Sequence, residues 1–197
     1  MTNKLLRPLL ACLLLLLALS GVCGAENRVL TFNSRDIGSW MVISQEEMPP
    51  IWKFFVCMDI QNVTTMEQNG QTYLDCQIMR VSIPMSMPSQ CFPDSKWHVL
   101  LDAAKSRAFI LEEYTGTGPN TLGLAASKDI SLAGSAENWI TDWAVGKAAL
   151  EYLRANHPDL IPSGGAGNAS VSVPSGGTSG RMLNGHPEAL RIEDVLK

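Results

Sequence analysis

The stretch that decides the fold lies between residues 52 and 83 and reads WKFFVCMDIQNVTTMEQNGQTYLDCQIMRVSI. Near its centre is Asn69-Gly70, which is typical of a two-residue hairpin loop, because a type I′ turn needs a positive φ at both central residues. The flanking segments, 52–66 and 72–83, are rich in apolar, β-branched and aromatic residues, as strands are. The stretch therefore predicts a long antiparallel hairpin.

A two-residue loop at Asn69-Gly70 also fixes which residues of the two strands face each other. Met58 would face Val81 on an apolar face, and Asp59 would face Arg80 on a mostly polar one. This division is typical of an antiparallel pair with one buried face. A shift of the pairing by one residue would mix apolar and polar side chains on both faces. The alternative is a longer loop through residues 61–70, with only the outer parts of the strands paired.

The predicted register bears on the cysteines Cys57, Cys76 and Cys91. Cys76 would face Val63, which lies about 20 Å from Cys57 at roughly 3.3 Å per residue. A disulfide needs Cα atoms within about 7 Å. We therefore predict that Cys57 pairs with Cys91 and that Cys76 is free, with Cys76–Cys91 as the second choice.

Local patterns predict the elements around the hairpin. β-Branched and aromatic residues indicate strands at 29–32, 38–44, 107–114 and 121–127. Apolar residues at helical spacing predict one helix at 94–106 and a longer one at 136–156. The fold class is therefore α+β, an antiparallel sheet built around the hairpin and packed by one or two helices, with a flexible C-terminal tail.

The longer helix has recognisable ends and an apolar stripe. Ser135 is suited to cap its N-terminus, and Pro158 cannot continue it. The stripe consists of Trp139, Trp143, Gly146, Leu150 and Leu153. We expect this stripe to pack on the sheet.

Residues 1–25 have the three-part pattern of a secretory signal peptide. Lys4 and Arg7 precede an apolar run at 9–19, and small residues follow up to Ala25. We expect cleavage after Ala25, and the alternatives are an uncleaved anchor or a lipoprotein with lipid on Cys23. The protein is expected to be exported, to the periplasm of a Gram-negative bacterium or otherwise into the medium.

The charge and hydropathy of the remaining chain exclude some classes of partner. Loss of Lys4 and Arg7 would change the formal net charge from −4 to −6. Such a charge disfavours nucleic acid, whose binding depends on Lys and Arg. No later segment approaches 18 consecutive apolar residues, so no transmembrane span is expected in the mature chain.

The C-terminal part divides into a linker and a tail after a domain at 26–161. Thirteen of the 19 residues at 162–180 are Gly, Ser or Pro, which is typical of a flexible linker. In the tail, 181–197, a short helix would place Ile192, Val195 and Leu196 on one side. We predict that these three residues dock on a partner protein and are not part of the domain.

Few residues suggest chemistry. Cys91 near the N-terminus of a predicted helix, with His98 close in sequence, is the best candidate for a catalytic pair. His98 and Asp102 would lie four residues apart on that helix, a spacing that could hold a metal, but no metal motif is present. Asn62 and Asn168 match the glycosylation pattern, which matters only in a eukaryotic secretory pathway. No cofactor is implied.

The sequence is therefore interpreted as an exported binding or assembly protein without catalytic activity, such as a small component of an envelope complex. Its partner would be another exported or envelope protein. One alternative is a hydrolase or transferase that depends on Cys91. The other is a secreted inhibitor or immunity-type protein.

Overall fold

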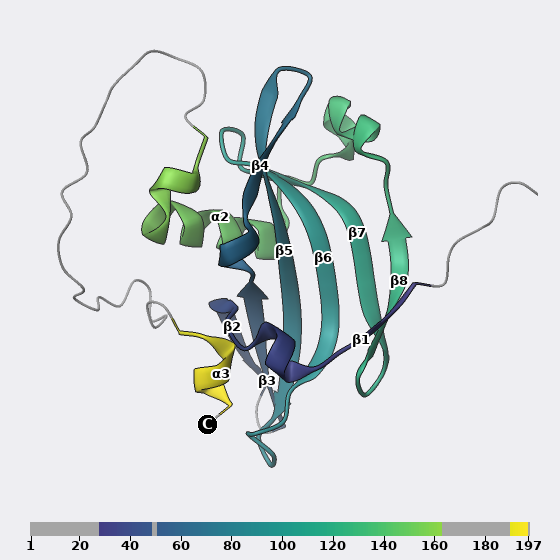
Figure 1. Ribbon diagram of the computed structural model, residues 1–197, viewed down its shortest axis with the longest axis vertical. Coiled ribbons are helices and arrows are strands. Elements are labelled where there is room, and N and C mark those ends of the chain that lie inside the picture. Colours follow the sequence, from purple (N-terminus) through teal and green to yellow (C-terminus); the bar gives the residue numbers. More distant parts are fainter. Residues whose placement is uncertain (1–27, 49–50, 163–189, 197) are drawn as a thin grey trace, which may run out of the picture.

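A computed structural model describes residues 28–48, 51–162 and 190–196 of the chain (Figure 1). The predicted signal peptide, the Cys23 alternative, the Asn168 sequon and most of the predicted linker lie outside these residues. Among the described residues, no helix is both long enough and apolar enough to cross a bilayer.

Eight strands form one antiparallel sheet, in the order β1-β8-β7-β6-β5-β3-β2, with β4 paired to β5 beyond the end of β3. Figure 1 shows β5 to β8 side by side. The strands are β1 (Val29–Thr31), β2 (Met41–Met48), β3 (Trp52–Met58), β4 (Thr64–Gln68), β5 (Gln71–Pro84), β6 (Phe92–Asp102), β7 (Arg107–Gly118) and β8 (Thr121–Ser127). The described chain is therefore mostly antiparallel sheet, and two short α-helices accompany it.

The tip of the predicted hairpin is confirmed. Asn69 and Gly70 both have positive φ, 52° and 71°, and Thr64 faces Asp75 as a two-residue loop requires. Below the tip the predicted register is wrong, because Met58 faces Ile78 and not Val81. The 3₁₀ turn η2 (Ile60–Asn62) separates β3 from β4 and shifts the pairing by three residues.

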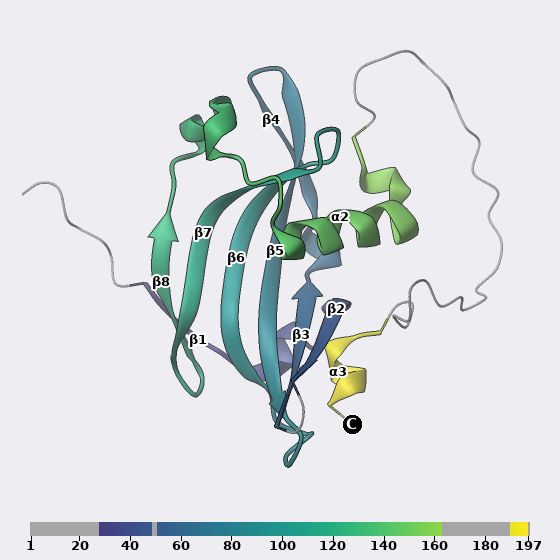
Figure 2. The ribbon, with the colours of Figure 1, turned by 180° about the vertical axis from the view of Figure 1, so that it is seen from behind.

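The shift places apolar side chains on both faces of the sheet. We name the face that carries Cys57 and Met79 the front face, and the face that carries Met58 and Ile78 the back face. Both faces are buried in this region, so the expected half-exposed hairpin is wrong. Helix α2 (Ala144–Asn156) lies across the back face, nearest the viewer in Figure 2.

The helix predicted at 94–106 is wrong, because this segment is β6. Trp97 and Leu101 point to the back face, whereas Leu100 joins a cluster on the front face. Since both faces of β6 are covered, its apolar residues do not alternate strictly with polar ones. The spacing of these apolar residues therefore resembles that of one face of a helix. Pairing with both β5 and β7 determines the strand.

The helix predicted at 136–156 begins later than expected but ends as expected. Ser135 precedes only a 3₁₀ turn, η4 (Ala136–Asn138), and α2 begins at Ala144. Between them, Ile140 exchanges two backbone hydrogen bonds with Ala108, at 2.9 and 2.8 Å. Trp139 consequently packs with a front-face cluster, whereas Trp143 packs on the back face.

The tail packs on its own domain, so the prediction that it is not part of the domain is wrong, whereas docking on a partner protein stays a prediction. Helix α3 (Ile192–Val195) lies beside β2 and β3 in both views (Figures 1 and 2). Ile192 is fully buried in the front-face cluster, and Val195 and Leu196 pack against that cluster. The amide of Val42 donates to Leu190 O at 2.8 Å, and the amide of Ile192 donates to Trp40 O at 3.1 Å.

The three cysteines of the described chain are buried free thiols. Cys57 and Cys91 share the front-face cluster, and Cys76 lies in the back-face cluster. The Cys57–Cys91 bridge is not formed in this structure. Because the two cysteines share one cluster, the bridge stays a prediction.

Candidate functional site

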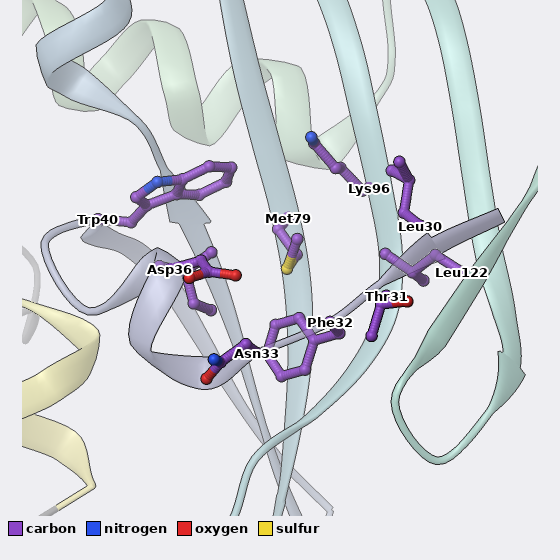
Figure 3. Close-up of a pocket in the computed structure, with 10 residues that line it drawn as sticks. Leu30, Thr31, Phe32, Asn33, Asp36, Trp40, Met79, Lys96 and Leu122 are labelled. Atoms are coloured by element: carbon purple, nitrogen blue, oxygen red, sulfur yellow. The ribbon is translucent and has the colours of Figure 1, made fainter. Parts of the chain in front are cut away.

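A cavity of about 180 Å³ lies on the front face of the sheet (Figure 3). Its roof is the segment 29–40, which we name the strap, and its floor is formed by β5, β6 and β8. The lining residues from the strap are Leu30, Thr31, Phe32, Asn33, Asp36, Ile37 and Trp40, and those from the sheet are Met79, Lys96 and Leu122.

The strap crosses the front face because its two ends are fixed at different strands. At one end β1 pairs with β8, and the amide of Phe32 donates to Asn120 O at 2.7 Å. Next, the side chain of Asn33 accepts from the amide of Arg35 at 3.1 Å and caps the 3₁₀ turn η1 (Ser34–Ile37). At the other end, Trp40 is buried just before β2.

The wall of the cavity is mainly apolar, but it also holds the polar side chains of Thr31 and Asn33 and, at different places, two charged side chains. Asp36 projects from η1, and Lys96 projects from β6; Figure 3 shows them on different sides of Met79. In the described part of the chain, neither side chain makes a hydrogen bond or an ion pair. Burial lowers the pKa of Lys96, although the carboxylates of Glu112 and Asp59 act in the opposite direction.

A row of polar side chains continues from Lys96 across the front face. His98 Nε2 lies 2.7 Å from Asp75 Oδ1. Glu112 accepts from Arg28 at 2.9 Å and from the Tyr114 hydroxyl at 3.1 Å. Asp75, His98 and Glu112 lie on the neighbouring strands β5, β6 and β7, and His98 faces Glu112 directly. Most of the charges near the cavity are therefore already paired.

The hydrogen bond with Asp75 raises the pKa of His98, whereas burial lowers it. The negative charges of Asp75 and Glu112 also raise this pKa, and the positive charge of Lys96 lowers it. We predict an imidazole pKa above its ordinary value of 6.5, and a fall in this pKa in the Asp75→Asn variant. Because the folded state holds the proton more tightly, the contribution to stability is complete below pH 6.5 and is lost as the pH rises through the raised pKa. An NMR titration of the His98 ring in both proteins tests this, and an equal pKa in the two would contradict it.

The catalytic pair considered from the sequence is not brought together. Cys91 precedes β6, and His98 lies six residues along that strand from Phe92, about 20 Å at roughly 3.3 Å per residue. Burial raises the pKa of the Cys91 thiol to about 11, so the thiol is protonated at neutral pH and is a poor nucleophile. The described residues give the Cys91-dependent hydrolase or transferase no support.

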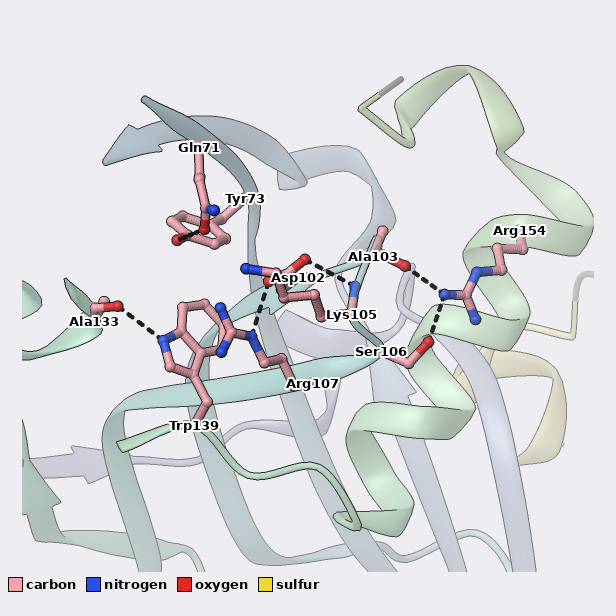
Figure 4. A network of polar contacts seen from close by, with 10 residues as sticks. All are labelled: Gln71, Tyr73, Asp102, Ala103, Lys105, Ser106, Arg107, Ala133, Trp139 and Arg154. Atoms are coloured by element: carbon pink, nitrogen blue, oxygen red, sulfur yellow. Dashed lines mark hydrogen bonds and ion pairs between the residues drawn. The ribbon is translucent and has the colours of Figure 1, made fainter. Parts of the chain in front are cut away.

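The metal pair considered from the sequence is also separated, because His98 and Asp102 lie on a strand and have different partners. Asp102 accepts from Arg107 Nε at 2.9 Å and from the amide of Lys105 at 3.1 Å (Figure 4). Within the described ranges, no three potential ligands are grouped around a point that could hold a metal ion.

The network in Figure 4 supports the fold rather than a ligand. The guanidinium of Arg107 lies 4.5 Å from the ring centre of Trp139, and Trp139 Nε1 donates to Ala133 O at 2.8 Å. Arg154 of α2 donates to Ala103 O at 2.7 Å and to Ser106 Oγ at 3.0 Å. These contacts fix the hairpin between β6 and β7 to the segments on both faces of the sheet.

A second depression, of about 350 Å³, lies between β4 and the 3₁₀ turn η5 (Pro158–Leu160), which follows α2. Its lining residues are Val63, Thr64, Thr65, Leu74, Asp159 and Leu160. Only Leu74 among them is fully buried, and none is aromatic. The strap cavity is the better candidate, since ligand sites combine apolar and aromatic walls with a few placed polar groups.

Sequence reasoning did not identify the charged residues of the strap cavity, Asp36 and Lys96. The lining comes from four separate parts of the chain, around residues 30–40, 79, 96 and 122. No short motif connects them, and Lys96 was assigned to a helix. A correct assignment of β6 would have placed Lys96 on the same face as Met79, which is its partner in the sheet.

Comparisons with known proteins identify no relative: no family model matches the chain, and no significant match is found among curated proteins or solved structures.

Proposed function

We propose that the protein is an exported binding protein, without catalytic activity, that holds a small and mainly apolar molecule in the strap cavity. Export follows from the signal-peptide pattern of residues 1–25. The observation that carries the binding function is a formed cavity whose wall holds two charges, on Asp36 and Lys96, that have no partner in the described chain.

The size and lining of the cavity suit a ligand of a few heavy atoms. Phe32, Trp40 and Met79 provide large apolar surfaces that are already buried. An apolar cavity of about 150 Å³ is enough to bind benzene. A cavity of about 180 Å³ therefore favours a compact molecule over a long acyl chain.

The strap also offers a route for the ligand. Its strand β1 has only three residues, and each is paired on one side only, with β8. Segments with few buried contacts open at low free energy. We infer that the β1 end of the strap lifts to admit a ligand, while the buried Trp40 holds the other end.

Catalysis is less well supported than binding. His98 is paired with the carboxylate of Asp75, an arrangement that also occurs in catalytic groups. However, no hydroxyl or thiol in residues 28–48, 51–162 and 190–196 makes a hydrogen bond with the His98 ring. Without an activated nucleophile, the pair is a structural ion pair on the sheet.

The cavity can be filled by one substitution, which tests the proposal. We predict that toluene binds to the wild type and that its affinity falls at least tenfold in Leu30→Trp, because the indole occupies the space beneath the strap. Leu124→Trp is the matched control, since Leu124 is also partly buried against the front-face cluster but does not line the cavity. Ligand-observed NMR with toluene measures the three affinities.

Two results would contradict the proposed function. One is the absence of toluene binding to the wild type. The other is equal affinity in Leu30→Trp and Leu124→Trp, because binding would then lie elsewhere.

A further inference from the structure

We propose that the natural ligand is a small zwitterion with an apolar body, an α-amino acid about the size of leucine, whose carboxylate contacts Lys96 and whose ammonium contacts Asp36. This inference rests on the proposed function and specifies the ligand of the same cavity. It follows from which charges around the cavity are paired and which are not.

The other ionic groups of this region have partners within the protein. Glu112 accepts hydrogen bonds from Arg28 and Tyr114, and Asp75 is paired with His98. Asp59 accepts from the side-chain amide of Asn62 at 2.8 Å. Lys96 and Asp36 therefore remain as one positive and one negative charge for a ligand.

Lys96 is suited to a ligand carboxylate. It lies between Met79 of β5 and Tyr114 of β7 in the sheet, and its side chain is partly buried at the cavity wall. A partly buried ammonium has lost some of its water, so a carboxylate that reaches it forms a strong, charge-assisted hydrogen bond. Burial lowers the pKa of Lys96, and the charges of Glu112 and Asp59 act in the opposite direction.

Asp36 provides the opposite charge at the solvent-exposed rim of the cavity. It lies on η1, within the strap, and Figure 3 shows its carboxylate between Trp40 and Met79. An ammonium bound there would also lie near the indole of Trp40, and cations are attracted to aromatic faces. Lys96 and Asp36 do not form an ion pair with each other, so each charge is available to a ligand.

The rest of the wall determines the body of the ligand. Leu30, Phe32, Ile37, Met79 and Leu122 form an apolar surface without hydrogen-bonding side chains. A polar side chain on the ligand would lose its water there without replacement. An aliphatic side chain of leucine size fits both the chemistry and the volume of about 180 Å³.

Three probes of similar size separate the contributions of the two charges. Leucine carries both charges, isovalerate carries only the carboxylate, and isoamylamine carries only the ammonium. Isothermal titration calorimetry at neutral pH is expected to show that leucine binds at least tenfold more tightly than either other probe. Hydrogen bonds to charged groups are strong enough for such a difference.

Two neutral variants assign the charges to their residues. Lys96→Gln is expected to lower the binding affinities of leucine and isovalerate at least tenfold and to leave the affinity of isoamylamine unchanged. Asp36→Asn is expected to lower the binding affinities of leucine and isoamylamine and to leave the affinity of isovalerate unchanged. Lys105→Gln and Asp159→Asn remove exposed charges outside the cavity and serve as matched controls. The unchanged probe in each variant shows that the cavity is still folded.

The possible failures are distinguishable. If toluene binds in the strap cavity but leucine binds no more tightly than isovalerate or isoamylamine, the proposal of a zwitterionic ligand is wrong and the proposed function stands. The same conclusion follows if leucine binds equally to the wild type and both neutral variants. If toluene does not bind to the wild type, the proposed function is wrong as well.

Discussion

Replacement of Trp139 by alanine is expected to lower the free energy of unfolding by about 3–5 kcal/mol, as for other buried aromatic residues. The ring centre of Trp139 lies 4.8 Å from that of Tyr73 and 5.7 Å from that of Phe109. Its indole also supports Arg107, and its Nε1 donates to Ala133 O. The substitution would therefore open a cavity and remove a hydrogen bond that attaches η3 (Ile130–Gly134) to the sheet.

Chemical denaturation of Trp139→Ala and of a control on the same segment tests this prediction. Leu132→Ala is the control, because Leu132 is 45% exposed and its loss should change stability by less than about 1 kcal/mol. Equal losses in the two variants would contradict the packing described for Trp139.

Ile192→Ala is expected to lower the free energy of unfolding by about 2–5 kcal/mol, the range for a buried isoleucine. Ile192 has no exposed surface and packs in the front-face cluster. Its amide donates to Trp40 O, and that of Glu193 donates to Gly38 O at 3.2 Å. The tail therefore stabilises the end of the strap next to β2.

Glu193→Ala is the control for the tail, because Glu193 is exposed and its ion pair with Arg191 lies at the surface, at 3.4 Å. Such pairs contribute about 0–1 kcal/mol. Thermal or chemical unfolding of both variants is the measurement. If Ile192→Ala were no less stable than Glu193→Ala, the tail would not belong to the core.

Elements with a strong local signal could be predicted from the sequence. Asn69-Gly70 determines its turn because both residues need positive φ, and they have it. The strand at 121–127 and the end of α2 at Asn156 also agree with their predictions. Each of these depends on turn or breaker residues that act on their immediate neighbours.

Features that depend on distant contacts could not be predicted. The spacing within β6 resembles a helix because both of its faces are covered by parts of the chain that are distant in sequence. The η2 turn shifts the register by three residues without a strong turn signal of its own. The sequence predicts that Ile192 docks on a partner protein, but in the structure Ile192 is buried in the same cluster as Trp40 of its own chain.

The candidate site was missed for the same reason. Cys91 and His98 were paired because they are close in sequence, but an extended strand separates them. Asp36 and Lys96 are distant in sequence, and the strap brings both to one cavity. Only the structure shows that these two charges lack the partners that Glu112 and Asp75 have.

The most direct test of the strap cavity is a methyl NMR titration of the protein with toluene, with ¹³C-methyl methionine as the reporter. Met79 lies on the cavity floor, whereas Met85 and Met87 are exposed in the loop between β5 and β6 and do not line the cavity. The structure predicts that the Met79 methyl resonance shifts with saturation while the resonances of Met85 and Met87 stay in place. An unchanged Met79 resonance, or equal shifts at all three methionines, would contradict a ligand site beneath the strap.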